Sequence, residues 1–114
     1  MNHCIVISIF VYMKTLIERT SAEKLNRASE MLKTMAHPVR LAIIDLIRNN
    51  VKLSNTDIQK KLNLEQPILS QHLTLMRDKG IIDFEKSGKF SYYYLKQNEF
   101  MQIIDCVENC CKKI

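Results

Sequence analysis

The chain has 114 residues, which is enough for one compact domain and too few for two ordinary ones. Its hydrophobic fraction of 46% and charged fraction of 25% exclude extended disorder and collagen-like structure, and two glycines with two prolines are too few turn formers for an all-β barrel. The net charge of +5 is compatible with a nucleic-acid partner but does not identify one.

Residues 4–13 form an apolar run, CIVISIFVYM. The run is too short for a membrane-spanning helix, which needs about 20 residues, and it lacks the basic flank and cleavage site of a secretory signal. Two interpretations stay open: an added strand or loosely packed tail, or an upstream misreading of a start at Met13. We therefore treat residues 1–13 as an uncertain extension and residues 14–114 as the domain, with a cytoplasmic location and no membrane partner expected.

Segments with helical spacing of apolar residues follow. The first, from about Ser21 to Met35, starts at a capping box formed by Thr20 and Glu23. The second, from Pro38 to about Arg48, is apolar nearly all round, so we expect it in the core.

A third and a fourth helix are separated by a turn of about three residues, which is the spacing of a helix-turn-helix. The third starts at a second capping-box pattern, residues 54–57, and ends at Asn63, which tolerates the left-handed conformation. The fourth runs from Glu65 to about Lys79 and stops at Gly80. Its inner stripe is Ile68 or Leu69, then His72 or Leu73, and then Met76.

Beyond this helix the apolar period becomes that of a strand. Residues 82–85 and 90–95 are predicted strands, and residues 86–89 are a basic turn between them. Asn98 is expected to cap a last helix whose apolar stripe is Phe100, Ile103, Ile104, Val107, Cys111 and Ile114. The predicted fold is mainly α with one β-hairpin, in the order helix–helix–helix–turn–helix–hairpin–helix of a winged helix-turn-helix.

This arrangement suits DNA, because an α-helix fits the major groove and polar side chains near its amino-terminal end reach base edges. The candidate base contacts are Gln66, Ser70, Gln71, His72 and Thr74. The candidate phosphate contacts, which add affinity without sequence information, are Lys60, Lys61, Arg77, Lys79, Lys86 and Lys89. Taken singly, each of these charges is more often part of a solvated face, so the prediction depends on the whole arrangement.

Two stretches, MAHPVRLAII at residues 35–44 and LEQPILSQHLTLMRDKGII at residues 64–82, resemble the ArsR/SmtB (arsenic-repressor) family of bacterial winged-helix regulators. The resemblance covers roughly residues 21–112. It implies a homodimeric repressor that binds operator DNA through the helix starting near Glu65 and is released by an inducer. It also implies a dimer formed by the first and last helices, and the candidate interface residues are Leu25, Leu32, Phe100, Ile103, Ile104 and Val107.

Two metal sites that the family uses lack ligands here. Ser54 and Thr56 stand where paired cysteines would be, and hydroxyls are poor ligands for soft metals. Asp105 is present on the last helix, but that helix carries no histidine for the family's zinc site. No cofactor is therefore certain.

Three cysteines near the carboxyl-terminal end, Cys106, Cys110 and Cys111, are the remaining candidates for an effector site. Two or three thiolates at this spacing suit arsenite, antimonite, copper(I) or cadmium, whereas disulfide or persulfide formation would sense oxidants or reactive sulfur. Plain packing explains Cys111 equally well. Cys4 could join such a site only if the first thirteen residues fold back. The inducer is not identified.

Other classes of function fit less of the sequence. The chain has no Ser–His–acid set and no phosphate-cradling glycine loop, so we do not expect an enzyme. The alternatives are a winged-helix module that binds proteins and a small thiol protein that binds metal, both without specific DNA binding.

Overall fold

The structure is a computed structural model that describes residues 15–49 and 51–114. The proposed extension of residues 1–13, including Cys4, lies outside the described residues. The chain divides into two compact units, a first that ends at Glu30 and a second from Met31 to Ile114, and each is described by itself.

The first unit contains α2 (Leu16–Arg19) and the beginning of α3 (Ala22–Met35). The Oγ1 of Thr20 donates a hydrogen bond to the carbonyl oxygen of Leu16 at 2.9 Å, so Thr20 ends α2. The cap of α3 is Ser21, whose Oγ accepts the backbone N–H of Lys24 at 3.1 Å. The prediction that Thr20 caps this helix is therefore wrong by one residue, because the short α2 uses that hydroxyl.

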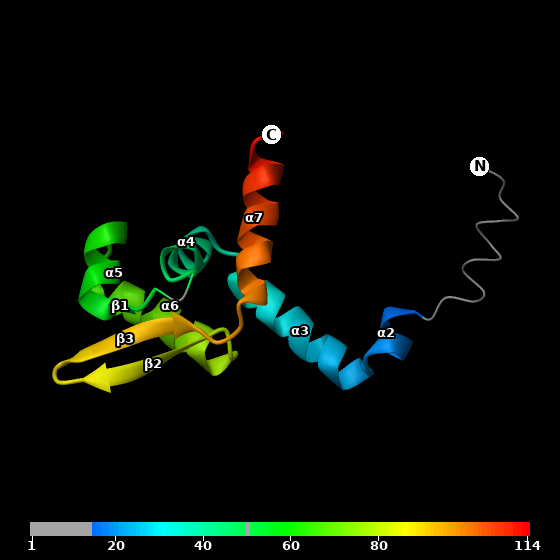
Figure 1. The fold of residues 1–114 in the computed structure, drawn as a ribbon, viewed down its shortest axis with the longest axis horizontal. Helices are drawn as coiled ribbons and strands as arrows, with labels where there is room; N and C mark the ends of the chain where they lie inside the picture. Colours follow the sequence, from blue (N-terminus) through cyan, green and yellow to red (C-terminus); the bar gives the residue numbers. More distant parts are fainter. Residues whose placement is uncertain (1–14, 50) are drawn as a thin grey trace, which may run out of the picture. The chain divides into compact units, whose positions relative to one another are not determined.

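The second unit holds the end of α3 and the remaining elements (Figure 1). These are α4 (Pro38–Leu46), β1 (Leu53–Ser54), α5 (Asn55–Leu62), α6 (Gln66–Asp78), β2 (Ile82–Ser87), β3 (Phe90–Leu95) and α7 (Glu99–Cys111). The predicted mainly helical fold with a hairpin is confirmed. Within the described ranges, no helix is long and apolar enough to cross a membrane.

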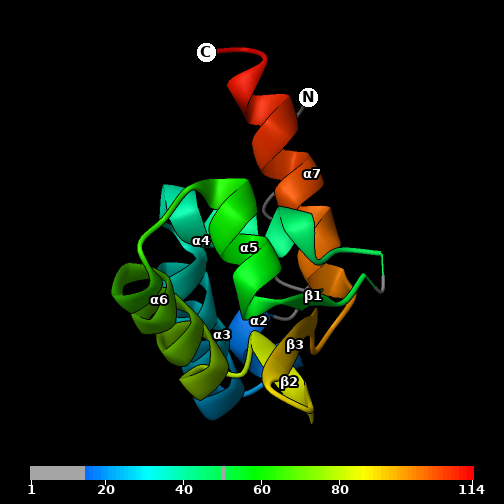
Figure 2. The ribbon, with the colours of Figure 1, turned by 90° about the vertical axis from the view of Figure 1, so that its left-hand side faces the viewer.

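The strands form one antiparallel sheet in the order β1-β3-β2, so β3 lies between its two neighbours (Figure 2). Ser87 pairs with Phe90, which leaves a two-residue turn whose first residue, Gly88, has a φ of +63°. That is the conformation a type II′ hairpin turn requires. β1 was not predicted, because a strand of two residues is too short to show an alternating pattern.

One hydrophobic core collects side chains from all the helices of the second unit. Its buried members are Met35, Ile43, Ile44, Ile47, Ile58, Leu69, Leu73, Met76, Ile81, Ile82, Phe100 and Ile104. The prediction that α4 lies in the core is confirmed, since Ile43 and Ile44 are fully buried. Burying each such side chain stabilises the fold by about 2 kcal/mol relative to leaving it in water.

Local signals fix the ends of the helices around the helix-turn-helix. The Oγ of Ser54 accepts a hydrogen bond from the N–H of Asp57 at 3.0 Å, and Oδ2 of Asp57 accepts one from the N–H of Ser54 at 3.3 Å. The predicted capping box of α5 is therefore confirmed. Asn63 ends α5 with a φ of +51°, and Gly80 follows α6 with a φ of +81°. Asn98 occupies the predicted cap position of α7, but its backbone is helical and its side chain makes no capping hydrogen bond.

Candidate nucleic-acid interface

α6 presents a polar face to solvent. The turn before it spans residues 63–65, and Pro67 fits its first turn because no helical hydrogen bond is needed there. The side chains of Leu69, Leu73 and Met76 point into the core. Four of the five predicted base contacts remain exposed on the other side of the helix: Gln66, Ser70, Gln71 and Thr74.

His72 is placed differently. It is half-buried, and its Nδ1 accepts a hydrogen bond from Nε of Arg40 at 3.2 Å. Its ring lies 4.7 Å from the ring of His37, measured between centroids. Burial, and then the nearby His37 and Arg40, lower the pKa of His72 below its ordinary value. His72 therefore acts as a neutral acceptor that holds α6 against α4, and we leave it out of the proposed base contacts.

Arg40 joins three helices at this point. Its Nη1 donates to the carbonyl oxygen of Thr34, near the end of α3, at 2.7 Å. His37 caps α4, because its Nδ1 accepts the N–H of Val39 at 3.1 Å. The sequence did not show this cluster, since Arg40 and His72 are 32 positions apart and only the folded chain brings them together.

Two apolar side chains on α6 are also exposed. Ile68 is 43% exposed and Leu75 is 36% exposed. The sequence pattern allowed either Ile68 or Leu69 on the inner stripe, and packing selects Leu69. Apolar side chains on a DNA-reading helix can contact the methyl group of thymine, so Ile68 and Leu75 join the candidate contact face.

The basic candidates fall into two groups. Lys60 and Lys61 lie exposed in the last turn of α5, and Lys86 and Lys89 lie exposed on the hairpin. Among residues 15–49 and 51–114, no ion pair is recorded for these four lysines. Their charges are therefore available to phosphates, whereas Lys79 is half-buried at the end of α6.

Arg77 holds the hairpin rather than standing free. Its Nε lies 3.3 Å from Oδ1 of Asp83, and its guanidinium lies over the ring of Phe84, 4.3 Å from the centroid. Glu85 is paired in the same way with Lys52, at 3.0 Å. Both acidic side chains of the hairpin are thus paired with basic side chains. The tip of the hairpin therefore keeps the positive charge of Lys86 and Lys89.

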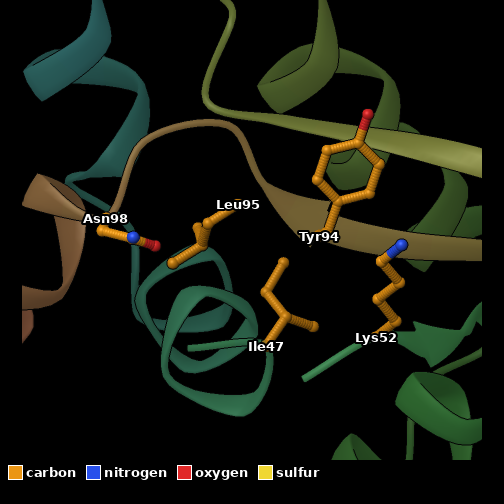
Figure 3. A pocket seen from close by; sticks show the side chains of 5 residues that line it. All are labelled: Ile47, Lys52, Tyr94, Leu95 and Asn98. Carbon is orange, nitrogen blue, oxygen red and sulfur yellow. The ribbon is translucent and has the colours of Figure 1, made fainter. Parts of the chain in front are cut away.

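A small cavity of about 80 Å³ lies beside the sheet. In Figure 3 Ile47 and Leu95 occupy its middle, with Asn98 and Lys52 on opposite sides. Pockets for small ligands usually have about 300–1,000 Å³, so this one is a packing gap and not a ligand site.

The three carboxyl-terminal cysteines are exposed free thiols at the end of α7. The part of the chain that the structure describes contains no group of three or more His, Cys, Asp or Glu side chains that could hold a metal. Asp105 is engaged with Arg48, at 3.0 Å. The described part of one chain therefore does not assemble a three-thiolate site for a soft metal.

The six candidate dimer residues differ in what they can offer a partner. Phe100 and Ile104 are buried in the chain's own core, with only 5% and 8% of their surface exposed, so they have little left for a second copy. Leu32 on α3 is exposed, Leu25 is half-buried, and Ile103 and Val107 on α7 are half-buried.

Known proteins share this sequence and fold. Residues 37–83 match the family described as "Bacterial regulatory protein, arsR family". The chain is 31% identical over 86 residues to an HTH-type transcriptional regulator of Methanocaldococcus jannaschii, covering 75% of this chain and 97% of the relative. It is 33% identical over 84 residues to the biofilm growth-associated repressor of Agrobacterium fabrum, covering 71% of each chain. The crystal structure of the transcriptional repressor PagR of Bacillus anthracis matches with a TM-score of 0.67 and 35% identity, covering 75% of this chain and 97% of that one.

The matched segment begins at His37, the cap of α4, and ends in β2, so it contains the complete helix-turn-helix. The relatives are regulators of transcription, which agrees with the expectation that the chain is not an enzyme. The chain belongs to the ArsR family of winged helix-turn-helix, DNA-binding transcriptional regulators.

Proposed function

We propose that the chain is a homodimeric repressor that places α6 of each protomer in the major groove of one operator half-site. The observation that carries this proposal is the exposed face of α6. It combines the polar side chains of Gln66, Ser70, Gln71 and Thr74 with the apolar ones of Ile68 and Leu75. Glutamine pairs bidentately with adenine, and the serine and threonine hydroxyls donate to or accept from several bases.

Phosphate contacts on both sides of α6 fix its position. Lys60 and Lys61 are on the helix before it, and Lys86 and Lys89 are on the hairpin after it. Such contacts give affinity and orientation but no sequence information. The lysines therefore set how tightly DNA is held, and the face of α6 sets which DNA is preferred.

The dimer is proposed to form through α3 and α7. The support is that Leu32, Ile103 and Val107 keep apolar surface that the described chain does not cover completely. A two-fold dimer matches an operator made of two inverted half-sites, each read by one recognition helix.

Release by an inducer is proposed to act at Cys106, Cys110 and Cys111. All three thiols are exposed on α7, which packs against α4, and α4 in turn contacts α5 and α6 of the helix-turn-helix. A metal or metalloid such as arsenite would need thiolates from two protomers to complete a site of three, whereas an oxidant or reactive sulfur species needs only two thiols that can meet. A disulfide between protomers at the α7 ends is the simplest of these changes.

Selection from a pool of random duplexes tests the DNA-binding part of this proposal. We expect the reduced protein to enrich an inverted repeat with half-site centres separated by about 10 base pairs or a multiple of that distance. Enrichment of one unrepeated site would contradict the dimeric mode. If no duplex is enriched, the result would contradict specific DNA binding and favour a winged-helix module that binds proteins.

A further inference from the structure

Phe90 is an exposed aromatic side chain at the tip of the hairpin. It is 43% exposed, it directly follows the two-residue turn, and it pairs with Ser87. Its one recorded ring contact in the described chain is an edge-on approach to Tyr92, with centroids 6.4 Å apart. The core that buries Phe100 does not cover it.

The tip also stands beyond the rest of the sheet. β1 pairs only with Tyr92 and Tyr93 of β3, so Phe90 lies past the end of the third strand. In Figure 1 the turn joining β2 to β3 is at the end of the hairpin remote from α4 and α7. A large apolar group at that position is open to whatever approaches the hairpin.

The charges around Phe90 indicate which partner approaches. Asp83 and Glu85 are neutralised by Arg77 and Lys52, at 3.3 Å and 3.0 Å. Lys86 and Lys89 have no recorded ion pair among the described residues. The apolar ring therefore lies between positively charged side chains. This combination favours a nucleic-acid groove, whose edges are lined by sugars and phosphates, over a protein surface with few acidic residues.

We propose that Phe90 is an apolar wedge that the hairpin inserts into the minor groove next to the half-site read by α6. This inference rests on the proposed function, because α6 in the major groove is what carries the hairpin to the neighbouring minor groove. Apolar wedges in minor-groove proteins partly unstack one base step and kink the duplex. Phe90 therefore adds a preference for a deformable step, such as TA or CA, at a position that α6 does not touch.

The experiment uses the duplex that the wild-type protein selects from a random pool, with 2-aminopurine placed in turn at each step flanking the half-sites. Wild-type binding should raise the fluorescence at one flanking step, because unstacking relieves the quenching of this base. Phe90→Ala should abolish that rise and weaken binding about tenfold while leaving the salt dependence unchanged, since no charge is lost. Phe90→Leu should keep most of both effects, because leucine also serves as a wedge.

Lys89→Ala is the matched control on the same turn. It should weaken binding to every duplex and reduce the salt slope by roughly one, yet keep the fluorescence rise. No rise at any flanking step with the wild-type protein would overturn the wedge, whatever the variants do. A wild-type protein that selects no duplex would instead overturn the proposed function, so the two failures are distinct.

Discussion

Single side chains on α6 are proposed to determine the sequence preference, and Gln71 is the one most easily tested. It is exposed on the face opposite the buried Leu69 and Leu73. A bidentate glutamine–adenine pair contributes about 1–3 kcal/mol of discrimination.

Gln71→Ala should therefore lower the affinity for the selected duplex about 10- to 100-fold and leave the affinity for a scrambled duplex unchanged. Fluorescence anisotropy on both duplexes measures the ratio. Gln102→Ala, which removes an exposed glutamine from α7, is the control and should change neither affinity. An equal loss on both duplexes would show that Gln71 does not read a base.

The sequence predicted which residues form the exposed face of α6, but not the contacts that its side chains make with distant residues. The face of α6 followed from helical periodicity alone, because Ser70, Gln71 and Thr74 fall opposite the apolar positions. Periodicity did not predict that the side chain of His72 is half-buried, because its position depends on a hydrogen bond from Arg40, which lies 32 positions earlier. The same holds for the Arg77–Asp83 pair, which forms only when α6 and β2 meet, while a phosphate contact of Arg77 stays a prediction.

At the level of elements, two polar contacts add to the buried apolar side chains that hold α6 in place. The Arg40–His72 hydrogen bond fastens α6 to α4, and the Arg77–Asp83 pair fastens α6 to β2. The hydrogen bond requires an unprotonated Nδ1 on His72, so acid should weaken it.

The pKa of His72 in the folded chain lies below the 6.5 of the free side chain. The unfolded chain consequently binds more protons as pH falls below 6.5, so the free energy of unfolding drops with falling pH until the lowered folded pKa is passed. Thermal unfolding from about pH 8 to about pH 5 should show this loss for the wild type and less of it for His72→Gln. Gln71→Ala, with no titrating group removed, should follow the wild type. Identical pH profiles for His72→Gln and wild type would contradict the assignment.

Most elements were predictable because they carry their own local signals. The apolar periods predicted α3 to α7 and the hairpin, and Ser54 and Asn63 marked the ends of α5. β1 is two residues long and is a strand only because it pairs with β3. α2 is a four-residue helix whose start is fixed by its own capping box. The identity of β1 therefore depends on hydrogen bonds to a distant strand, whereas α2 carries the local signal of Thr15 and Glu18, which the search for apolar periods passed over because four residues are too few to show a period.

At the scale of the whole molecule, the repressor is proposed to work as a dimer. Leu32→Asp places a charge on a side chain that is 52% exposed in the single chain, so folding should persist while the proposed interface fails. Analytical ultracentrifugation should show a shift from dimer to monomer, together with loss of tight operator binding. Val51→Asp, at another exposed apolar position, should leave the dimer intact. A dimeric Leu32→Asp protein would exclude this surface from the interface.

Replacing Cys106, Cys110 and Cys111 together with serine tests the proposed response to an inducer. Because the three thiols are exposed and belong to α7, a different helix from α6, affinity for the selected duplex should stay within about twofold of wild type. Release by arsenite, cadmium or a polysulfide should disappear. Anisotropy with each reagent added in turn measures both effects, and release that persists in the triple variant would refute a role for these cysteines.

The exposed face of α6 is proposed to select DNA by sequence. The direct measurement is fluorescence anisotropy of the reduced protein on the selected duplex and on a scrambled duplex of the same composition, at one stated salt concentration. We expect the selected duplex to bind at least about a thousandfold more tightly. Equal affinities with the same salt dependence would mean that the lysines alone hold DNA, and would contradict this proposal.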